Sequence, residues 1–158
     1  MTKIGDIKLI KQQEGYCGPA SLKMVLDHYG VVKSQKTLAK MMGATHKDGV
    51  EEQRLIDTAK KLGFTAYARK DTTLPSLKNL IKKGIPVIVG WFSVDEEHYS
   101  VVKEIGYREI KIADPETAKI RTFPLKDFVK MWFGKSPGDK VNYGEIVVVR
   151  PKTKLGQK

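Results

Sequence analysis

The sequence has little cysteine and no long apolar run. Cys17 is the only cysteine among 158 residues, so the chain cannot form an internal disulfide. The longest apolar stretch, residues 85–92, is far shorter than the roughly 20 residues that a membrane-spanning helix requires. Residues 1–6 contain no apolar core of a secretory signal. These absences predict a cytoplasmic protein without a membrane span.

Sequence motifs for several classes of ligand are also missing. The chain contains no zinc finger, no glycine-rich phosphate loop and no aromatic motif of an RNA-binding sheet. Its formal net charge is +11, but the lysines are spread along the sequence. We interpret them as solvated helix faces and predict neither a nucleic-acid partner nor a cofactor. The alternative, a basic nucleic-acid binder, predicts an affinity that falls steeply with salt.

Length and composition favour one compact domain. The residues are 41% apolar, and a chain of this length can bury most of its surface in one core. We expect residues 1–150 to form this domain. We expect residues 151–158 to be a basic, disordered tail.

The first half of the chain has the pattern of helices. Proline favours the first turn of a helix, so Gly18-Pro19 predicts a helix start, with Cys17 at its N-terminus. Further helices are expected at residues 34–43, 50–63 and 73–84, each ending at a glycine. A short extended lead is expected at residues 7–10, and a strand at residues 64–69.

The second half of the chain has the pattern of strands. They are expected at residues 85–92, 98–105, 108–114, 119–123 and 144–150, with a short helix opened by Pro124. Helices followed by an antiparallel sheet indicate the α+β class. We therefore expect an N-terminal helical half packed on a C-terminal antiparallel sheet.

Cys17 is a candidate nucleophile, and a histidine is needed to activate it. The chain has three: His28 inside the first predicted helix, His46 in a loop, and His98 at the start of a strand. A base that faces a helix N-terminus is best held by a rigid neighbouring strand. His98 is therefore the predicted base, and the other two histidines are expected to be structural.

The hairpin that follows His98 predicts an acidic partner for it. A turn centred on Gly106 would place His98 directly opposite Asp114, near enough for the carboxylate to orient the imidazole. The same register would form two cross-strand ion pairs, Glu104 with Arg108 and Lys103 with Glu109. A slip of one residue would remove this alignment.

Cysteine, histidine and aspartate in these roles are what acyl transfer through a thiol requires. The helix N-terminus and an imidazolium would favour the thiolate. The oxyanion that develops needs donors, and the backbone amide of Cys17 can be one. A side-chain amide upstream, from Gln12 or Gln13, can be the other.

Two other interpretations compete with catalysis. A lone cysteine is by default a small buried apolar residue. Cys17, His98 and Asp114 are also residue types that bind zinc, although no paired Cys-x-x-Cys or His-x-x-x-His spacing supports a metal site.

Four blocks of sequence occur in this order: Tyr16-Cys17-Gly18-Pro19-Ala20, Gly84-Ile85-Pro86-Val87, His98-Tyr99-Ser100-Val101-Val102 and Asp114-Pro115. Together they resemble the papain-like bacteriocin-processing cysteine peptidases, and the resemblance runs from Gln12 to about Trp132. That family comprises double-glycine leader peptidases, often fused to ABC transporters, and their stand-alone relatives.

The resemblance implies a papain-like fold and a cysteine peptidase of the stand-alone kind. It implies Cys17 as nucleophile, His98 as base, Asp114 as third member and an upstream glutamine as oxyanion donor. The family's glutamine stands where this chain has Lys11, so we assign the role to Gln12. The expected partners are a peptide or small-protein substrate and a separate ABC transporter. The alternative is a catalytically silent module that binds a leader peptide.

Overall fold

The structure is a computed structural model that describes every residue except 1, 6, 48, 94–95, 137–139 and 153–158. Glycine and hydroxyl residues set the helix boundaries. The Ser34 hydroxyl accepts a hydrogen bond from the amide of Thr37, and Gly43 closes the same helix in the left-handed conformation. The helices are α1 (Cys17–His28), α2 (Gln35–Met42), α3 (Glu52–Lys61), α4 (Leu74–Lys82) and α5 (Leu125–Met131).

Most strands form one antiparallel sheet, in the order β2-β9-β3-β4-β5-β6, and β1 pairs with the edge of β4. The second strand in sequence thus pairs with the last one. The strands are β1 (Thr2–Lys3), β2 (Phe64–Arg69), β3 (Val87–Ser93), β4 (Glu96–Ile105), β5 (Glu109–Asp114), β6 (Lys119–Pro124), β7 (Phe133–Ser136), β8 (Lys140–Tyr143) and β9 (Ile146–Pro151).

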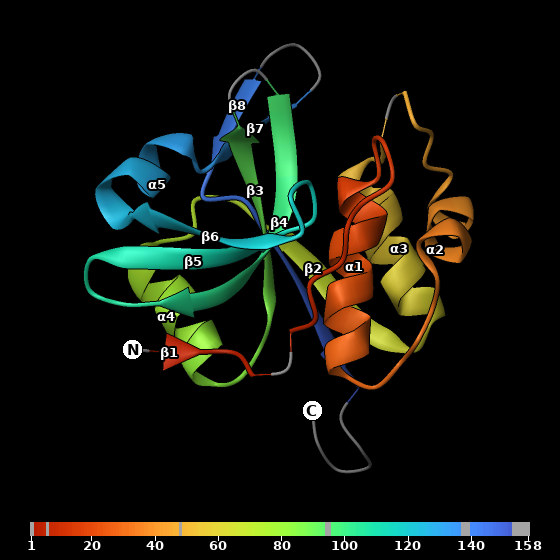
Figure 1. Cartoon of the computed structure of the whole chain (residues 1–158), viewed down its shortest axis with the longest axis horizontal. Coiled ribbons are helices and arrows are strands. Elements are labelled where there is room, and N and C mark those ends of the chain that lie inside the picture. Colours follow the sequence, from red (N-terminus) through yellow and green to blue (C-terminus); the bar gives the residue numbers. More distant parts are fainter. Residues whose placement is uncertain (1, 6, 48, 94–95, 137–139, 153–158) are drawn as a thin grey trace.

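Helices cover both faces of the sheet. In Figure 1, α1, α2 and α3 gather on one side, and α4 and α5 lie on the other. Successive residues of β3 divide between two apolar clusters, because side chains alternate across a strand. Val87 and Val89 pack with α4 and α5, whereas Ile88 packs with α1, α2 and α3. The predicted α+β class and its helical half packed on an antiparallel sheet are confirmed.

Most predicted elements form within a few residues of their expected bounds, and the structure adds to or extends the rest. The extended lead at residues 7–10 takes no part in the sheet. The hairpin of β7 and β8 was not predicted, although it packs beside β3. The last strand continues through Pro151, into the expected tail, of which residues 153–158 lie outside the described residues.

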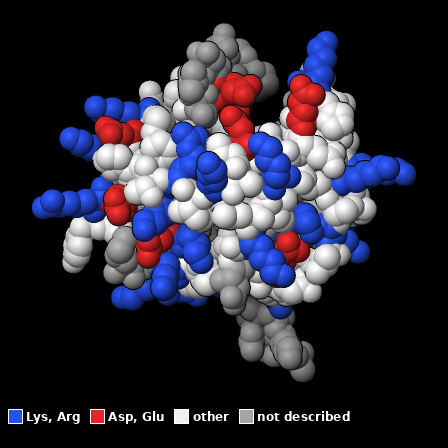
Figure 2. Space-filling model, in the orientation of Figure 1, with Lys and Arg blue, Asp and Glu red and all other residues white. Residues whose placement is uncertain are grey.

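Lysine and arginine side chains are spread over the visible face of the molecule, with acidic side chains between them (Figure 2). This arrangement agrees with the dispersed lysines of the sequence. In the described part of the chain, every helix is too short or too polar to cross a membrane.

Candidate active site

Cys17 is the first residue of α1, as the proline after it predicted. The first amides of a helix have no acceptor within the helix, so they point out of its N-terminus as free donors. Two glycines bring this end of α1 close to its neighbours. A side chain at Gly18 would lie 2.3 Å from Val50, and Gly15 has a positive φ of 74° and abuts the backbone of His46.

His98 on β4 is buried and is bound to an equally buried carboxylate on β5. Its Nε2 lies 2.6 Å from Oδ1 of Asp114. The other oxygen of Asp114 accepts a hydrogen bond of 3.1 Å from Arg121 on β6, and Oδ1 also accepts one of 3.0 Å from the amide of Glu116. Three donors thus hold the carboxylate in place, and the carboxylate fixes the ring of His98.

The predicted register of this hairpin is wrong. Val102 pairs with Ile112, two residues away from the predicted partner, and a bulge then shifts the register again before Glu104. The predicted ion pairs of Glu104 with Arg108 and of Lys103 with Glu109 are replaced by one between Glu104 and Lys111, at 3.4 Å. The turn is longer than assumed, since β4 ends at Ile105 and β5 begins only at Glu109.

His98 and Asp114 nevertheless meet, because a displacement of two residues leaves a side chain on the same face of the sheet. They are therefore diagonal neighbours rather than directly opposite ones, and the imidazole is long enough to span the diagonal. A displacement of one residue would have put them on opposite faces. The predicted contact is present even though the predicted register is not.

The charges around His98 favour its protonated form. Burial lowers the pKa of His98, but hydrogen bonds with Asp114 and with the Cys17 thiol, together with their negative charges, raise it to about 9. Burial also acts to raise the pKa of Asp114, and the contacts with His98, Glu116 and Arg121 outweigh this and lower it. The pair is therefore arranged to carry an imidazolium beside a carboxylate.

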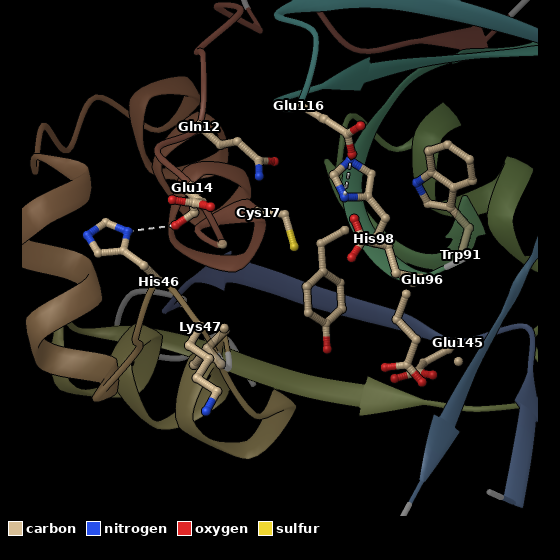
Figure 3. Close-up of a pocket in the computed structure, with 17 residues that line it drawn as sticks. Gln12, Glu14, Cys17, His46, Lys47, Trp91, Glu96, His98, Glu116 and Glu145 are labelled. Atoms are coloured by element: carbon tan, nitrogen blue, oxygen red, sulfur yellow. Dashed lines mark hydrogen bonds and ion pairs between the residues drawn. The ribbon is translucent and has the colours of Figure 1, made fainter. Parts of the chain in front are cut away.

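The two candidate glutamines differ in position. Gln12 lines the same pocket as Cys17 and His98, whereas Gln13 is exposed. Figure 3 shows Gln12 and Cys17 on one side of this pocket and His98 and Glu116 facing them. The geometry therefore favours Gln12 over Gln13 as the residue that can reach a reacting carbonyl.

The pocket has a volume of about 410 Å³ and lies between the N-terminus of α1 and the sheet. Five of its lining residues are glutamates, although the whole chain is strongly basic: Glu14, Glu96, Glu97, Glu116 and Glu145. The side chain of Glu145 lies where Gly134 leaves room, since a Cβ there would be 2.2 Å from its Oε2. Burial and the neighbouring Glu52 raise the pKa of Glu145 to about 8.

Sequence reasoning missed several residues around this site. Arg121 stands over the ring of Trp91 at 5.4 Å while it binds Asp114. Its signal was its place two residues beyond Lys119, the cross-strand partner of Asp114, on the same face of the sheet. Glu116, whose Oε2 lies 3.7 Å from Nδ1 of His98, could not be foreseen from spacing.

The other two histidines contact backbone, away from the Asp114 carboxylate. Nδ1 of His28 lies 3.1 Å from the carbonyl oxygen of Gly5. His46 stacks on Tyr16 and lies 2.7 Å from the carbonyl oxygen of Glu14, at the rim of the pocket. Among the described residues, no group of three cysteine, histidine or acidic side chains is arranged to hold a metal ion.

Comparison with known proteins gives a consistent result. Residues 6–136 match the peptidase C39 family. The chain is 34% identical over 137 residues to the lactococcin-G-processing and transport ATP-binding protein LagD of Lactococcus lactis subsp. lactis. That match covers 80% of this chain and 18% of LagD. An uncharacterized protein of Methanothermobacter marburgensis is 33% identical over 119 residues, covering 75% of this chain and 78% of that protein.

Solved structures share the fold. A double glycine motif protease from an AMS/PCAT transporter, solved in complex with the leader peptide, superposes with a TM-score of 0.68 at 21% identity. The match covers 96% of this chain and 99% of that one. The resemblance found in the sequence is thereby confirmed, and because the family match spans most of its length, the chain belongs to the peptidase C39 family.

Proposed function

We propose that this protein is a cysteine peptidase that cleaves a peptide bond through an acyl-enzyme intermediate. Peptidase domains of the C39 family are cysteine peptidases. The observation that best supports the proposal for this chain is the geometry at His98. One ring nitrogen lies 2.6 Å from the carboxylate of Asp114, and the Cys17 thiol lines the same pocket as the ring and helps to raise its pKa. Nucleophile and base thus line one pocket, and the orienting acid is bound to the base behind it.

The proposed reaction uses these contacts in sequence. His98 holds the proton of the Cys17 thiol, and the thiolate attacks the carbonyl carbon of the substrate peptide bond. The amide of Cys17 and the side chain of Gln12 donate hydrogen bonds to the oxyanion. As the C–N bond breaks, the imidazolium protonates the leaving amine. Water, deprotonated by His98, then hydrolyses the thioester and restores the thiol.

Asp114 stabilises the imidazolium in both halves of this cycle. Its carboxylate keeps Nε2 of His98 occupied, which leaves Nδ1 to exchange protons with the thiol and the leaving amine. Arg121 and the amide of Glu116 keep the carboxylate itself fixed. The depressed pKa of Asp114 means that this carboxylate stays ionised throughout the neutral range.

We propose a precursor with a double-glycine leader as the substrate. LagD is named for processing and transport, and the AMS/PCAT protease was solved with its leader peptide. The chain spans 18% of the length of LagD, which is named as a transport ATP-binding protein, and we propose an ABC transporter as the partner. A free thiol without a disulfide partner is consistent with the cytoplasm, where we place the reaction.

The test combines cleavage with thiol labelling. A peptide with a Gly-Gly leader end should be cleaved by the native protein and by His28→Ala, and left intact by Cys17→Ala and His98→Ala. His28 is a matched control because it lies on α1 with its ring against the carbonyl of Gly5 and the ring of Tyr29, outside the pocket lining. Cleavage by Cys17→Ala, or failure of iodoacetamide to label Cys17 in the folded protein, would refute the proposal. Tight binding of the leader without turnover would favour the silent binding module.

A further inference from the structure

We propose that Gln35 is a positioning residue that holds the oxyanion donor Gln12 in place. The inference rests on the proposed function, and in particular on the role of Gln12. Gln35 is the first residue of α2 and lies outside the pocket lining. It touches neither Cys17 nor His98, so it can act only through the segment that carries Gln12.

The side chain of Gln35 binds the backbone on both sides of Gln12. Its Nε2 donates a hydrogen bond of 2.7 Å to the carbonyl oxygen of Lys11, and its Oε1 accepts one of 3.0 Å from the amide of Gln13. One primary amide has a donor and an acceptor side by side, so it can pair with an extended segment as a neighbouring strand would. Both bonds fix the peptide groups that flank Gln12.

The opposite edge of the same segment is fixed by the turn between β5 and β6. The amide of Gln12 donates a hydrogen bond of 2.8 Å to the carbonyl oxygen of Pro115. Pro115 directly follows Asp114, whose carboxylate binds His98. The backbone at Gln12 is therefore held between α2 and Pro115, the residue after Asp114. Removal of Gln35 leaves the hydrogen bond to Pro115 but removes the two bonds to α2.

The amide of Gln12 depends on this backbone support. Its Oε1 is buried and finds no hydrogen-bond partner among the residues that the structure describes. A side-chain amide whose own oxygen is unbound is located by the backbone that carries it rather than by bonds at its tip. A shift of the Gln12 backbone would thus move the donor away from the oxyanion directly, and small displacements of this kind are costly in catalysis.

Gln35 itself sits on a rigid base. The Ser34 hydroxyl caps α2 by accepting from the amide of Thr37 at 3.0 Å, and Leu38 and Ala39 anchor the helix in the core. The adjacent Lys36 is exposed on the same turn. Lys36→Ala is therefore a matched control that alters α2 without touching the segment of Gln12.

The experiment compares Gln35→Ala with Lys36→Ala, using N-acetyl-Gly-Gly p-nitrophenyl ester as the probe. Ester hydrolysis passes through an oxyanion, whereas alkylation of Cys17 by iodoacetamide does not. We expect Gln35→Ala to lower kcat by about 5- to 20-fold, less than the roughly 100-fold expected for Gln12→Ala, with KM nearly unchanged. The rate of Cys17 alkylation should stay within about twofold of the native rate, since the thiol and His98 are untouched.

A double variant separates positioning from general stability. In the Gln12→Ala background, Gln35→Ala should cause no further loss of kcat, because there is no donor left to position. A second loss of the same size would overturn the inference, as would native kcat in Gln35→Ala alone. If Gln12→Ala itself has native kcat, the proposed oxyanion role of Gln12 fails instead. If Cys17→Ala still hydrolyses the ester at the native rate, the peptidase proposal fails.

Gln35→Glu keeps the test decisive if the alanine variant does not fold. A glutamate still accepts from the amide of Gln13 but cannot donate to the carbonyl oxygen of Lys11 at neutral pH. Its kcat should therefore fall below the native value, with unchanged alkylation of Cys17. Native kcat in this variant would overturn the inference.

Discussion

Replacing Asp114 with asparagine should abolish the raised pKa of His98. Asparagine has the shape of aspartate without its charge, so the ring of His98 loses the anion 2.6 Å from Nε2 while remaining buried. Burial is the largest effect on His98, and it lowers the pKa. The pKa should therefore fall from about 9 to near or below its ordinary value of 6.5. NMR titration can measure this, because the chain has only three histidines.

The same substitution should change how stability depends on pH. The pKa of His98 is higher in the folded protein than in the unfolded chain. Its imidazolium therefore stabilises the fold fully below pH 6.5, and this contribution is lost as the pH rises through about 9. With one pKa unit equal to about 1.4 kcal/mol, the rise from 6.5 to about 9 corresponds to about 3 kcal/mol.

Urea unfolding at pH 6 and pH 10 measures this contribution. Between the two pH values the native protein should lose about 3 kcal/mol more free energy of unfolding than Asp114→Asn does. Asp127→Asn, at an exposed carboxylate on α5, should behave as the native protein does. Peptide cleavage by Asp114→Asn should fall by at least about 100-fold. Equal pH dependence in the native protein and Asp114→Asn, or a native pKa of 6.5 at His98, would refute the reasoning.

Three further predictions concern the framework of the site. Gly15→Ala should lower the melting temperature by several degrees and impair cleavage, because φ is +74° and a Cβ would lie 2.2 Å from the carbonyl oxygen of His46. Gly30→Ala, where the Cβ would meet open space, should lower the melting temperature less. Phe128→Ala should cost about 3–5 kcal/mol of unfolding free energy in urea, since the ring is fully buried. Glu145→Gln should raise the melting temperature more at pH 9 than at pH 5. The folded pKa of about 8 lies above the ordinary value of 4.5, so this carboxyl destabilises the fold increasingly as the pH rises from 4.5 to about 8.

Local signals were sufficient to predict the helices and most strands. Ser34 and Thr73 cap α2 and α4 with their hydroxyls, and glycines end these helices where expected. The hairpin of β7 and β8 was missed because each of its strands has only four residues. A strand that short has too few residues to show its period.

Part of the site was also predictable from the sequence. His98 and Asp114 meet as predicted, since the parity of residues along a strand survives an error of two in the register, and Cys17 lines the same pocket as His98. The bulge before Glu104 has no signature in the sequence, so the exact pairing could not be found. Gln35 contacts a segment more than 20 residues away, which no local pattern reports, whereas the place of Arg121 two residues beyond Lys119 offered a signal.

The pairing of Gln12 with Pro115 also bears on when the site assembles. These residues are 103 positions apart, so loop closure over most of the chain must precede their contact. During synthesis, α1 and its thiol emerge long before the strands that hold His98 and Asp114. If Cys17 acts as proposed, a nascent chain carries an unactivated cysteine until these strands have left the ribosome, which separates the folding of the helices from the onset of reactivity.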